Sequence, residues 1–428
     1  MHTGNAGPKY LDLFAGAGGL SEGFIRAGFS PIAHIEMNKA ACFTLKTRLS
    51  YWWLKANNQL EKYDEYMEGN LSREELYDLV PKTVIDTVIE SEISKSNLEE
   101  IFKKIEGLSD GEKIKLIIGG PPCQAYSVVG RSRQGSTVRE DQRNNLYLMY
   151  AEFLKRFEPE MFVFENVIGL LSAKDEDNAN IFEKMITLFK TIGYCVEYKV
   201  LNAKDYGVLQ DRKRIILIGW KNSTNFIYPN IVQIKNNCMV DEIFKDLPKI
   251  KAGGGNYRPT STLNYCGEYL YESGIKQINK EKVTLHYARK HCKRDLEIYK
   301  RVVNSWNNDE KRLMYDALPA RLITHKNTES FLDRFKVVPE NREFSHTVVA
   351  HLSKDGHYYI HPDIKQNRSL TPREAARLQS FPDNYYFESV SGISSMTAAF
   401  MQIGNAVPVR MAEAIATSIK VQFDQFSQ

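Results

Sequence analysis

Residues 9–24 read KYLDLFAGAGGLSEGF, and this stretch decides the fold. A short apolar run stops at a cluster of alanine and glycine, and apolar residues at helical spacing follow. The stretch therefore predicts a strand, a glycine turn and a helix. A second strand is predicted over residues 30–35 and closes on Glu36, 20 residues after Gly16. Glycines let a ligand approach the backbone, and an acid at this spacing can accept hydrogen bonds from ribose hydroxyls.

The glycine turn indicates a nucleoside cofactor, but it lacks the full GxGxxG pattern of a dinucleotide site. That difference favours S-adenosylmethionine over a pyrophosphate cofactor. A glycine-rich turn made only for tight packing would have the same composition, so the turn alone leaves both interpretations open.

Further strands and helices are predicted outward from this turn. A helix is expected over residues 39–49, and strands are expected at 114–118, 161–164 and 214–219. Strands that alternate with helices predict an α/β fold with a doubly wound, mostly parallel sheet.

Two segments interrupt the alternation and suggest the domain organisation. Residues 50–112 are charged and helix-prone, and we expect them to form an inserted surface element. From residue 236 to about 368 the chain is richer in Gly, Asn, Tyr and basic residues, which predicts a second domain. The expected division is a catalytic domain over 1–235, a second domain over 236–366, and a hinge and return to the catalytic domain over 367–428.

Composition is that of an ordinary globular protein, with 43% hydrophobic and 26% charged residues. No stretch approaches the ~20 apolar residues of a membrane helix, and the small, polar start does not resemble a secretory signal. We therefore expect a cytoplasmic protein that has no membrane partner. Six scattered cysteines without a CxxC pair favour reduced thiols over disulfides or a metal site.

Charge is uneven along the chain, although the net charge is only +4. Residues 61–112 contain 15 acidic and 6 basic residues, whereas residues 236–368 contain 23 basic and 17 acidic residues. The basic segment could bind nucleic acid, but a solvated face would have the same composition.

The sequence GGPPCQAYS at residues 119–127 follows the strand predicted at 114–118. Two prolines fix the backbone before Cys123, so its thiol is expected at the carboxyl end of a strand, where ligands bind in open α/β sheets. The loop 130–144 carries four arginines and could close over a phosphate backbone.

Two more polar clusters adjoin predicted strands, FENV at 164–167 and QDRKR at 210–214. A carboxyl group at a strand end can donate a proton if its pKa is raised, and arginines on alternate strand residues share one face. Taken alone, a helix cap would explain Glu165 and Asn166 equally well, and surface charge would explain Arg212 and Arg214.

Seven motifs together decide between these alternatives. In order, DLFAGAGGL, Glu36, GGPPCQAYS, FENV, QDRKR, RSLTPREAARLQSFPD and QIGNAVP resemble the ordered signature of the cytosine-5 DNA methyltransferase family. The resemblance covers the chain from Tyr10 onward, apart from 50–112 and much of 236–343. It implies a Rossmann-like, S-adenosylmethionine-dependent enzyme with an inserted target-recognition domain. Such an enzyme flips a cytosine out of duplex DNA and methylates its carbon 5.

By this resemblance Cys123 is the nucleophile, Glu165 the acid at the cytosine edge, and Arg212 and Arg214 its electrostatic support, with Asn166 beside them. The residues implied for the cofactor are Phe14, Ala15, Gly16, Gly18, Gly19, Glu36, Met37, Pro122, Leu146, Asn405, Ala406 and Val407. The residues implied for DNA contact are Gln124, Ser127, Arg131, Gln210 and Thr347. Thr347 is included because SHTV at 345–348 resembles a threonine-bearing element near the flipped base. The acid that contacts adenine in the family corresponds best to Glu92.

The resemblance also implies double-stranded DNA as substrate, S-adenosylhomocysteine as product, no metal, a monomer bound at the nucleoid, and pairing with a cognate restriction endonuclease. A transfer-RNA cytosine-5 methyltransferase of the same fold is the nearest alternative, and a recognition region of about 130 residues favours DNA. A silent DNA-binding regulator would not need the set formed by Cys123, Glu165, Arg212 and Arg214. A nicotinamide dehydrogenase would need a full dinucleotide fingerprint.

Overall fold

The computed structural model describes residues 7–122, 146–263, 265, 267–277, 282–325 and 329–426. Within these residues a seven-stranded sheet has the order β3-β2-β1-β4-β5-β7-β6. Its strands are β1 (Lys9–Leu13), β2 (Ser30–Glu36), β3 (Val88–Glu90), β4 (Leu116–Gly119), β5 (Met161–Asn166), β6 (Tyr194–Asn202) and β7 (Lys213–Lys221). The first five strands are parallel, and β7 runs antiparallel to both β5 and β6. The expected mostly parallel α/β fold is confirmed.

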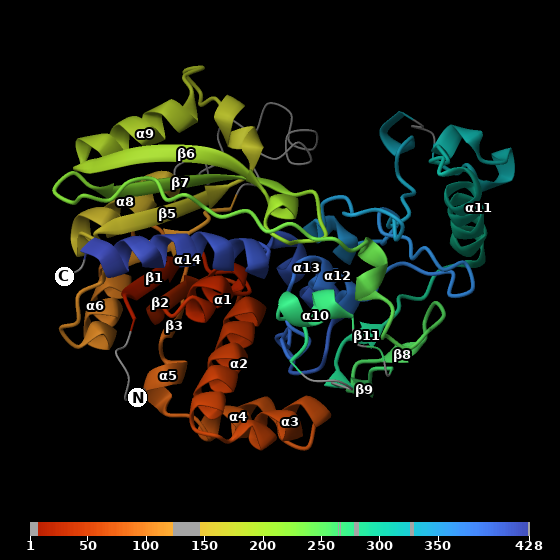
Figure 1. Cartoon of the computed structure of the whole chain (residues 1–428), viewed down its shortest axis with the longest axis horizontal. Coiled ribbons are helices and arrows are strands. Elements are labelled where there is room, and N and C mark those ends of the chain that lie inside the picture. Colours follow the sequence, from red (N-terminus) through yellow and green to blue (C-terminus); the bar gives the residue numbers. More distant parts are fainter. Residues whose placement is uncertain are drawn as a thin grey trace.

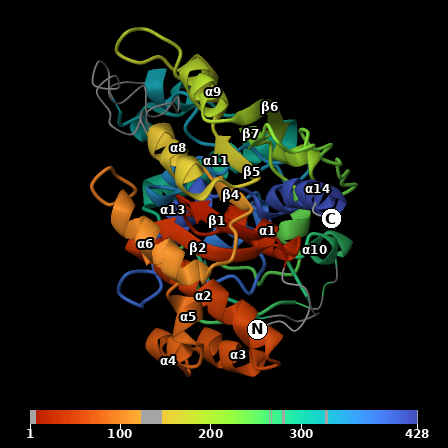
Figure 2. The same cartoon turned by 90° about the vertical axis from the view of Figure 1, so that its left-hand side faces the viewer.

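Helices cover both faces of this sheet, which is why its strands read as continuous apolar runs. On β5, Phe162 and Phe164 pack toward one layer of helices, while Met161 and Val163 pack toward the other. The first layer contains α6 (Leu98–Ser109), α8 (Leu146–Phe157) and α9 (Ile181–Thr191), and the second contains α1 (Gly19–Arg26) and α14 (Val409–Phe426). In Figure 2 the strands lie between α6 and α8 on one side and α1 and α14 on the other.

The segment 50–112 differs from the expected inserted surface element. Helix α2 (Lys39–Ala56) continues through its start, β3 pairs with β2 at the edge of the main sheet, and α6 packs on the sheet. The part outside these layers is α3 (Leu60–Glu68), α4 (Arg73–Asp78) and α5 (Lys82–Ile85). The acidic surface of this segment obscured apolar residues such as Val88 and Ile101, which are buried.

Most of the chain between β7 and α14 forms a second unit with little regular structure. Its small paired strands are β8 (Gly255–Asn256) with β11 (His286–Tyr287), and β9 (Thr260–Ser261) with β10 (Lys282–Val283). Its helices are α10 (Glu268–Glu272) and α11 (Lys293–Asp309), followed by α12 (Pro372–Leu378) and α13 (Met396–Asn405). Its short 3-10 turns are η5 (Val240–Ile243), η6 (Tyr315–Ala317), η7 (Ala320–Leu322), η8 (Glu329–Phe331) and η9 (Ala350–Ser353), whereas η3 (Ile168–Ser172) and η4 (Ala203–Asp205) precede β7.

Two hydrophobic clusters organise this unit. One joins residues from η5, α10 and η9 to α12 and α13, and the other surrounds α11. Figure 1 places α11 at the far side of the molecule from the sheet, while α14 returns along the sheet. Helices α12 and α13 therefore pack with the second unit before the chain returns. None of the helices in the described residues is long and apolar enough to span a membrane.

Candidate active site

The carboxyl edge of β1 and β2 carries the expected glycine turn and its acid. The strands are parallel neighbours with Leu13 opposite Ile35, so the turn after β1 and Glu36 lie side by side. The carboxylate of Glu36 accepts hydrogen bonds from the N–H of Gly16 at 2.8 Å and the N–H of Asn38 at 2.7 Å. Burial raises the pKa of Glu36, and these backbone N–H groups oppose the rise.

The glycines of the turn are required by close packing and by backbone conformation. A Cβ on Gly19 would lie 2.4 Å from the carbonyl oxygen of Val407 and 3.1 Å from the Cβ of Ala406. Gly16 has φ +56°, and no atom lies within 4 Å of the position its Cβ would take. The structure thus brings Ala406 and Val407 against the glycine turn and leaves the position beside Gly16 open. A ligand can therefore approach the backbone at Gly16 with the carboxylate of Glu36 beside it, as binding of a nucleoside requires.

The other residues expected at the cofactor have diverse surroundings. Met37 and Asn405 are exposed at the ends of β2 and α13, and Glu92 is exposed two residues after Glu90, which lies opposite Glu36 in the sheet register. A small pocket is lined by Pro121, Pro122, Leu146, Tyr147, Phe164, Asn166, Leu170, Ile181 and Met185. Pro122 and Leu146 therefore lie together at the carboxyl ends of β4 and β5.

Glu165 is held at the end of β5 by an ion pair. Its Oε1 lies 2.7 Å from Nε of Arg214, and both side chains are mostly buried. Gly120 makes room for the carboxylate, since a Cβ there would lie 2.5 Å from Glu165 Oε2. The neighbouring Asn166 donates from Nδ2 to the carbonyl oxygen of Pro121 at 3.2 Å. Strand β5 is thereby fixed to the segment that leads to Cys123.

Arg212 differs from the expected partner role beside Arg214. Its guanidinium is buried and donates to the carbonyl oxygens of Val348 and Gly404, whereas Arg214 supplies the ion pair with Glu165. Strand β7 begins at Lys213, so Arg212 precedes the regular strand and the rule of alternate faces does not extend to it. Arg212 thus joins the segment before β7 to the second unit and to the end of α13.

Gln210 was expected to contact DNA, and the structure corrects this. The side chain is fully buried, and its amide bonds to Leu378, Gln379 and the N–H of Val348. Because this amide is bonded to three partners in the interior, none of it is exposed for contact with DNA. The residue instead helps to hold residues 345–348.

Residues 345–348 lie against the segment 209–212 through several hydrogen bonds. The N–H of Asp211 donates to the carbonyl of Ser345, and the N–H of Ser345 donates to the carbonyl of Leu209. The hydroxyl of Thr347 donates to the carbonyl of Asp211 at 2.6 Å. Thr347 is partly exposed, and it lies next to the residues that lead into β7.

Four predicted site residues lie outside the described residues, namely Cys123, Gln124, Ser127 and Arg131. The basic run RKHCKR at residues 289–294 lies within the described residues, and its side chains have different surroundings. Arg289 donates to carbonyl oxygens of Leu352, Ser353 and Lys354, whereas Lys290, Lys293 and Arg294 are exposed.

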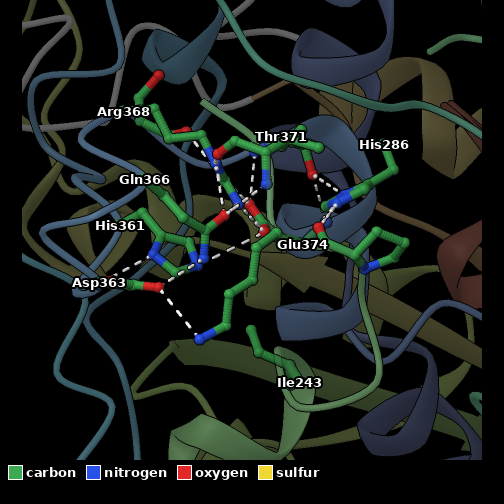
Figure 3. A network of polar contacts seen from close by, with 12 residues as sticks. Ile243, His286, His361, Asp363, Gln366, Arg368, Thr371 and Glu374 are labelled. Carbon is green, nitrogen blue, oxygen red and sulfur yellow. Dashed lines mark hydrogen bonds and ion pairs between the residues drawn. The ribbon is translucent and has the colours of Figure 1, made fainter. Parts of the chain in front are cut away.

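A buried polar network supports the RSLTPRE segment, and sequence reasoning did not foresee it (Figure 3). Arg368 donates to both carboxylate oxygens of Glu374, at 2.7 and 2.8 Å, and to the side chain of Gln366. Thr371 and Glu374 form a capping box at the start of α12. Burial would raise the pKa of Glu374, but Arg368 outweighs it and holds this pKa well below its usual range. The sequence TPRE at residues 371–374 is the pattern of a capping box and could have predicted it. Nothing local indicated His361, whose Nε2 lies 3.7 Å from Oε1 of Glu374.

The fold and the site together indicate the class of protein. A doubly wound sheet with a glycine turn after its first strand, closed by an acid at the end of the second strand, is the arrangement of Rossmann-like nucleoside-binding enzymes. The Glu165–Arg214 pair lies on the same edge of the sheet, at the carboxyl end of β5.

Comparison with known proteins then places the chain. The family model described as C-5 cytosine-specific DNA methylase matches residues 9–71 and 83–421. The chain is 39% identical to the Type II methyltransferase M.Bpa9945I of Bacillus paralicheniformis, over 96% of this chain and 98% of that protein. It is 29% identical to the Type II methyltransferase M.DdeI of Desulfomicrobium norvegicum, over 97% of this chain and 89% of that protein.

A solved structure shows the same fold. A protein from an E. coli prophage, described as a DNA modification methyltransferase, aligns with a TM-score of 0.64 at 23% identity, covering 97% of this chain and 99% of that one. The chain belongs to the C-5 cytosine-specific DNA methylase family. It is a DNA cytosine methyltransferase of the Type II restriction–modification type, and its family uses S-adenosylmethionine.

Proposed function

We propose that this enzyme methylates carbon 5 of a cytosine flipped out of a specific duplex sequence, through a covalent bond between Cys123 and carbon 6 of the base. The observation that carries the proposal is the Glu165–Arg214 pair at 2.7 Å, at the end of β5. Asn166 ties this strand end to Pro121, two residues before Cys123. The acid and the segment leading to the thiol are thus joined at one edge of the sheet.

The cofactor would lie at the glycine turn. Bound S-adenosylmethionine would supply the electrophilic methyl group. Glu36 would accept hydrogen bonds from the ribose hydroxyls, since its carboxylate already faces the turn through the N–H of Gly16. Ala406 and Val407 would close the site from the opposite side, because they pack against Gly19.

The proposed chemistry explains the residue types. Carbon 5 of cytosine is a poor nucleophile, so the Cys123 thiolate adds to carbon 6 and pushes electrons into the ring. Glu165 shares a proton with ring nitrogen 3 and stabilises the charge that develops there, and Arg214 orients Glu165. Carbon 5 would then take the methyl group from the bound cofactor, with S-adenosylhomocysteine as the leaving group. Transfer of the carbon-5 proton to water would expel the thiolate, return the shared proton to Glu165 and restore aromaticity. The base must leave the stack for these contacts to form.

The second unit would recognise the DNA. We assign residues 236–366 to target recognition and Thr347 to the neighbourhood of the flipped base, because its hydroxyl bonds to the backbone just before β7. We further propose that the enzyme acts as a monomer at the nucleoid, and that a cognate restriction endonuclease cleaves the same sequence when it is unmethylated.

Bisulfite sequencing tests this function directly. A plasmid recovered from a methylation-deficient host that expresses the enzyme should resist cytosine conversion at one short sequence and nowhere else. The Cys123→Ser variant should leave every cytosine convertible, because a hydroxyl is a far weaker nucleophile than a thiolate. Tritiated methyl transfer to DNA but not to transfer RNA would exclude the RNA alternative. Methylation by the serine variant at near-parental rate would contradict the covalent mechanism.

A further inference from the structure

Glu388 is a buried acid at which four parts of the chain meet, and the proposed reaction does not use it. Its side chain is 1% exposed and lies in the connection between α12 and α13. Its Oε1 accepts hydrogen bonds from Thr47 at 2.6 Å and from Tyr66, and Arg73 Nη1 lies 3.7 Å from its Oε2. A buried carboxylate is costly unless it is paired in this way.

The backbone of Glu388 continues the network into the helices beside the cofactor site. Its carbonyl accepts a hydrogen bond from Gln402 on α13 at 2.8 Å, and its N–H donates to Thr44 on α2 at 2.8 Å. The hydroxyl of Thr44 lies 2.6 Å from Oε1 of Gln402. Helices α2 and α13 are thus bonded to each other and to Glu388.

These bonds lie close to both walls of the proposed cofactor site. Thr44 lies one to two turns into the helix that begins just after Glu36, and Gln402 lies three residues before Asn405. Both residues lie within about two turns of the site, at about 5.4 Å per turn. A displacement of either helix therefore also displaces the wall at the end of that helix. The distance between the Glu36 wall and the 405–407 wall is therefore set partly at Glu388.

The extension formed by α3 and α4 holds this acid in place. Arg73 donates to the carbonyl of Ser389 at 2.8 Å, and its guanidinium lies 3.6 Å from the centre of the Phe43 ring. Helix α4 is anchored by Leu76, which is fully buried, and by Tyr77, whose hydroxyl donates to the carbonyl of Phe43. The family model matches residues 9–71 and 83–421, so this helix lies entirely in the segment that the model does not match.

We propose that the α3–α4 extension sets the affinity of the cofactor site, with Arg73 and Tyr66 as positioning residues that act through Glu388. The inference rests on the proposed cofactor site between Glu36 and residues 405–407. Arg73 and Tyr66 act on that site indirectly. They hold the connection between α12 and α13 against α2 and so fix the separation of its two walls.

Calorimetric titration with S-adenosylhomocysteine, without DNA, tests this role. Arg73→Ala should raise the Kd about tenfold, the size expected for losing a hydrogen bond to a charged group, and Tyr66→Phe should raise it by a smaller factor. Arg73→Lys keeps the charge beside Glu388 and should recover most of the affinity. In methylation assays the KM for S-adenosylmethionine should rise in parallel, with kcat at saturating cofactor nearly unchanged.

Matched variants separate positioning from general loss of stability. Tyr228→Phe removes a buried hydroxyl that donates to the carbonyl of Ile216 at 3.1 Å. Arg156→Ala removes an arginine paired with Glu106 on the surface of α8. Both controls should bind S-adenosylhomocysteine as the parent does.

The inference is overturned if Arg73→Ala and Tyr66→Phe bind with the Kd of the parent, or if the controls weaken binding as much. If Arg73→Ala does not fold, Tyr66→Phe and Arg73→Lys decide the matter by the same titration. A parent protein that does not bind S-adenosylhomocysteine would instead refute the proposed cofactor site.

Discussion

Replacing Gly120 by alanine would place a methyl group against the carboxylate of Glu165. The added Cβ would lie 2.5 Å from Oε2, whereas ordinary contact begins at 3.4 Å, so the carboxylate must retreat by about 0.9 Å. The closest clash involves the far end of a flexible side chain, and the backbone carbonyl oxygen of Glu165 at 3.2 Å need give by only a few tenths of an ångström, so the fold should survive. The same movement would break the 2.7 Å contact between Glu165 and Arg214.

The expected loss is therefore catalytic. A displacement of about 1 Å in a catalytic group can lower the rate ~100-fold, which corresponds to ~2.7 kcal/mol of transition-state stabilisation. The Kd for S-adenosylhomocysteine should stay within about threefold of the parent value, because Gly120 directly follows β4, beside Glu165 and away from Glu36.

Single-turnover methyl transfer at saturating DNA and cofactor measures this effect. Gly107→Ala is the matched control, since a Cβ on Gly107 in α6 would meet no atom within 4 Å. This control should keep the parental rate and be more stable by about 0.5–1 kcal/mol, as expected for Gly to Ala in a helix. A Gly120→Ala enzyme that transfers methyl groups within threefold of the parental rate would refute the role given to Glu165.

Three further predictions concern the nucleophile, acid stability and DNA binding. DNA with 5-fluorocytosine at the target should form a complex that survives denaturation, and mass spectrometry should locate the adduct on Cys123; an adduct on another cysteine would refute the assignment. Burial, with Arg368 nearby, lowers the pKa of His361 to about 3. The unfolded chain therefore takes up a proton below pH ~6.5 that the folded protein refuses. The contribution of the buried, neutral His361 to the free energy of unfolding is full above pH ~6.5, and it declines by up to ~1.4 kcal/mol per pH unit as the pH falls toward 3. Urea denaturation at pH 7 and 5 should show this decline, and His361→Gln should reduce it. Changing the exposed Lys290, Lys293 and Arg294 to alanine should weaken binding to all duplexes alike and flatten the salt dependence by up to about 0.9 log units per lost phosphate contact; an unchanged slope would exclude these residues from the DNA-binding surface.

The strands and the glycine turn could be predicted because their signals are local. An apolar run, a glycine cluster and an acid 20 residues later are enough to place Gly16 and Glu36 at the same edge of a parallel sheet. The observed hydrogen bond between Gly16 and Glu36 follows from that register.

Side-chain direction could not be predicted, because it depends on where an element begins and on residues far away. Arg212 and Arg214 differ by two positions, yet β7 begins between them, and the partners of Arg212 lie 136 and 192 residues further along the chain. Glu388 was equally inaccessible to sequence reasoning, since its partner Tyr66 is 322 residues away.

Net charge misled the interpretation of residues 50–112. Their acidic surface suggested a separate insert, whereas β3, three residues long, pairs with the main sheet and α6 buries one stripe formed by Leu98, Ile101, Phe102 and Ile105. A short edge strand and one buried helical stripe contribute too few apolar residues to dominate a composition count.

The catalytic side holds residues 345–348 largely by their peptide groups. The side chains of Gln210 and Arg212 bond to the N–H and carbonyl of Val348, and the backbone on either side of Gln210, at Leu209 and Asp211, pairs with Ser345. Every amino acid except proline carries both of these groups. Any residue other than proline at 348 therefore offers the same two groups, so the side chains of the proposed recognition region can change without rebuilding its attachment. If that region reads the DNA as we propose, one attachment can serve a succession of target sequences, and a lineage can exchange one specificity for another while its reaction centre stays unchanged.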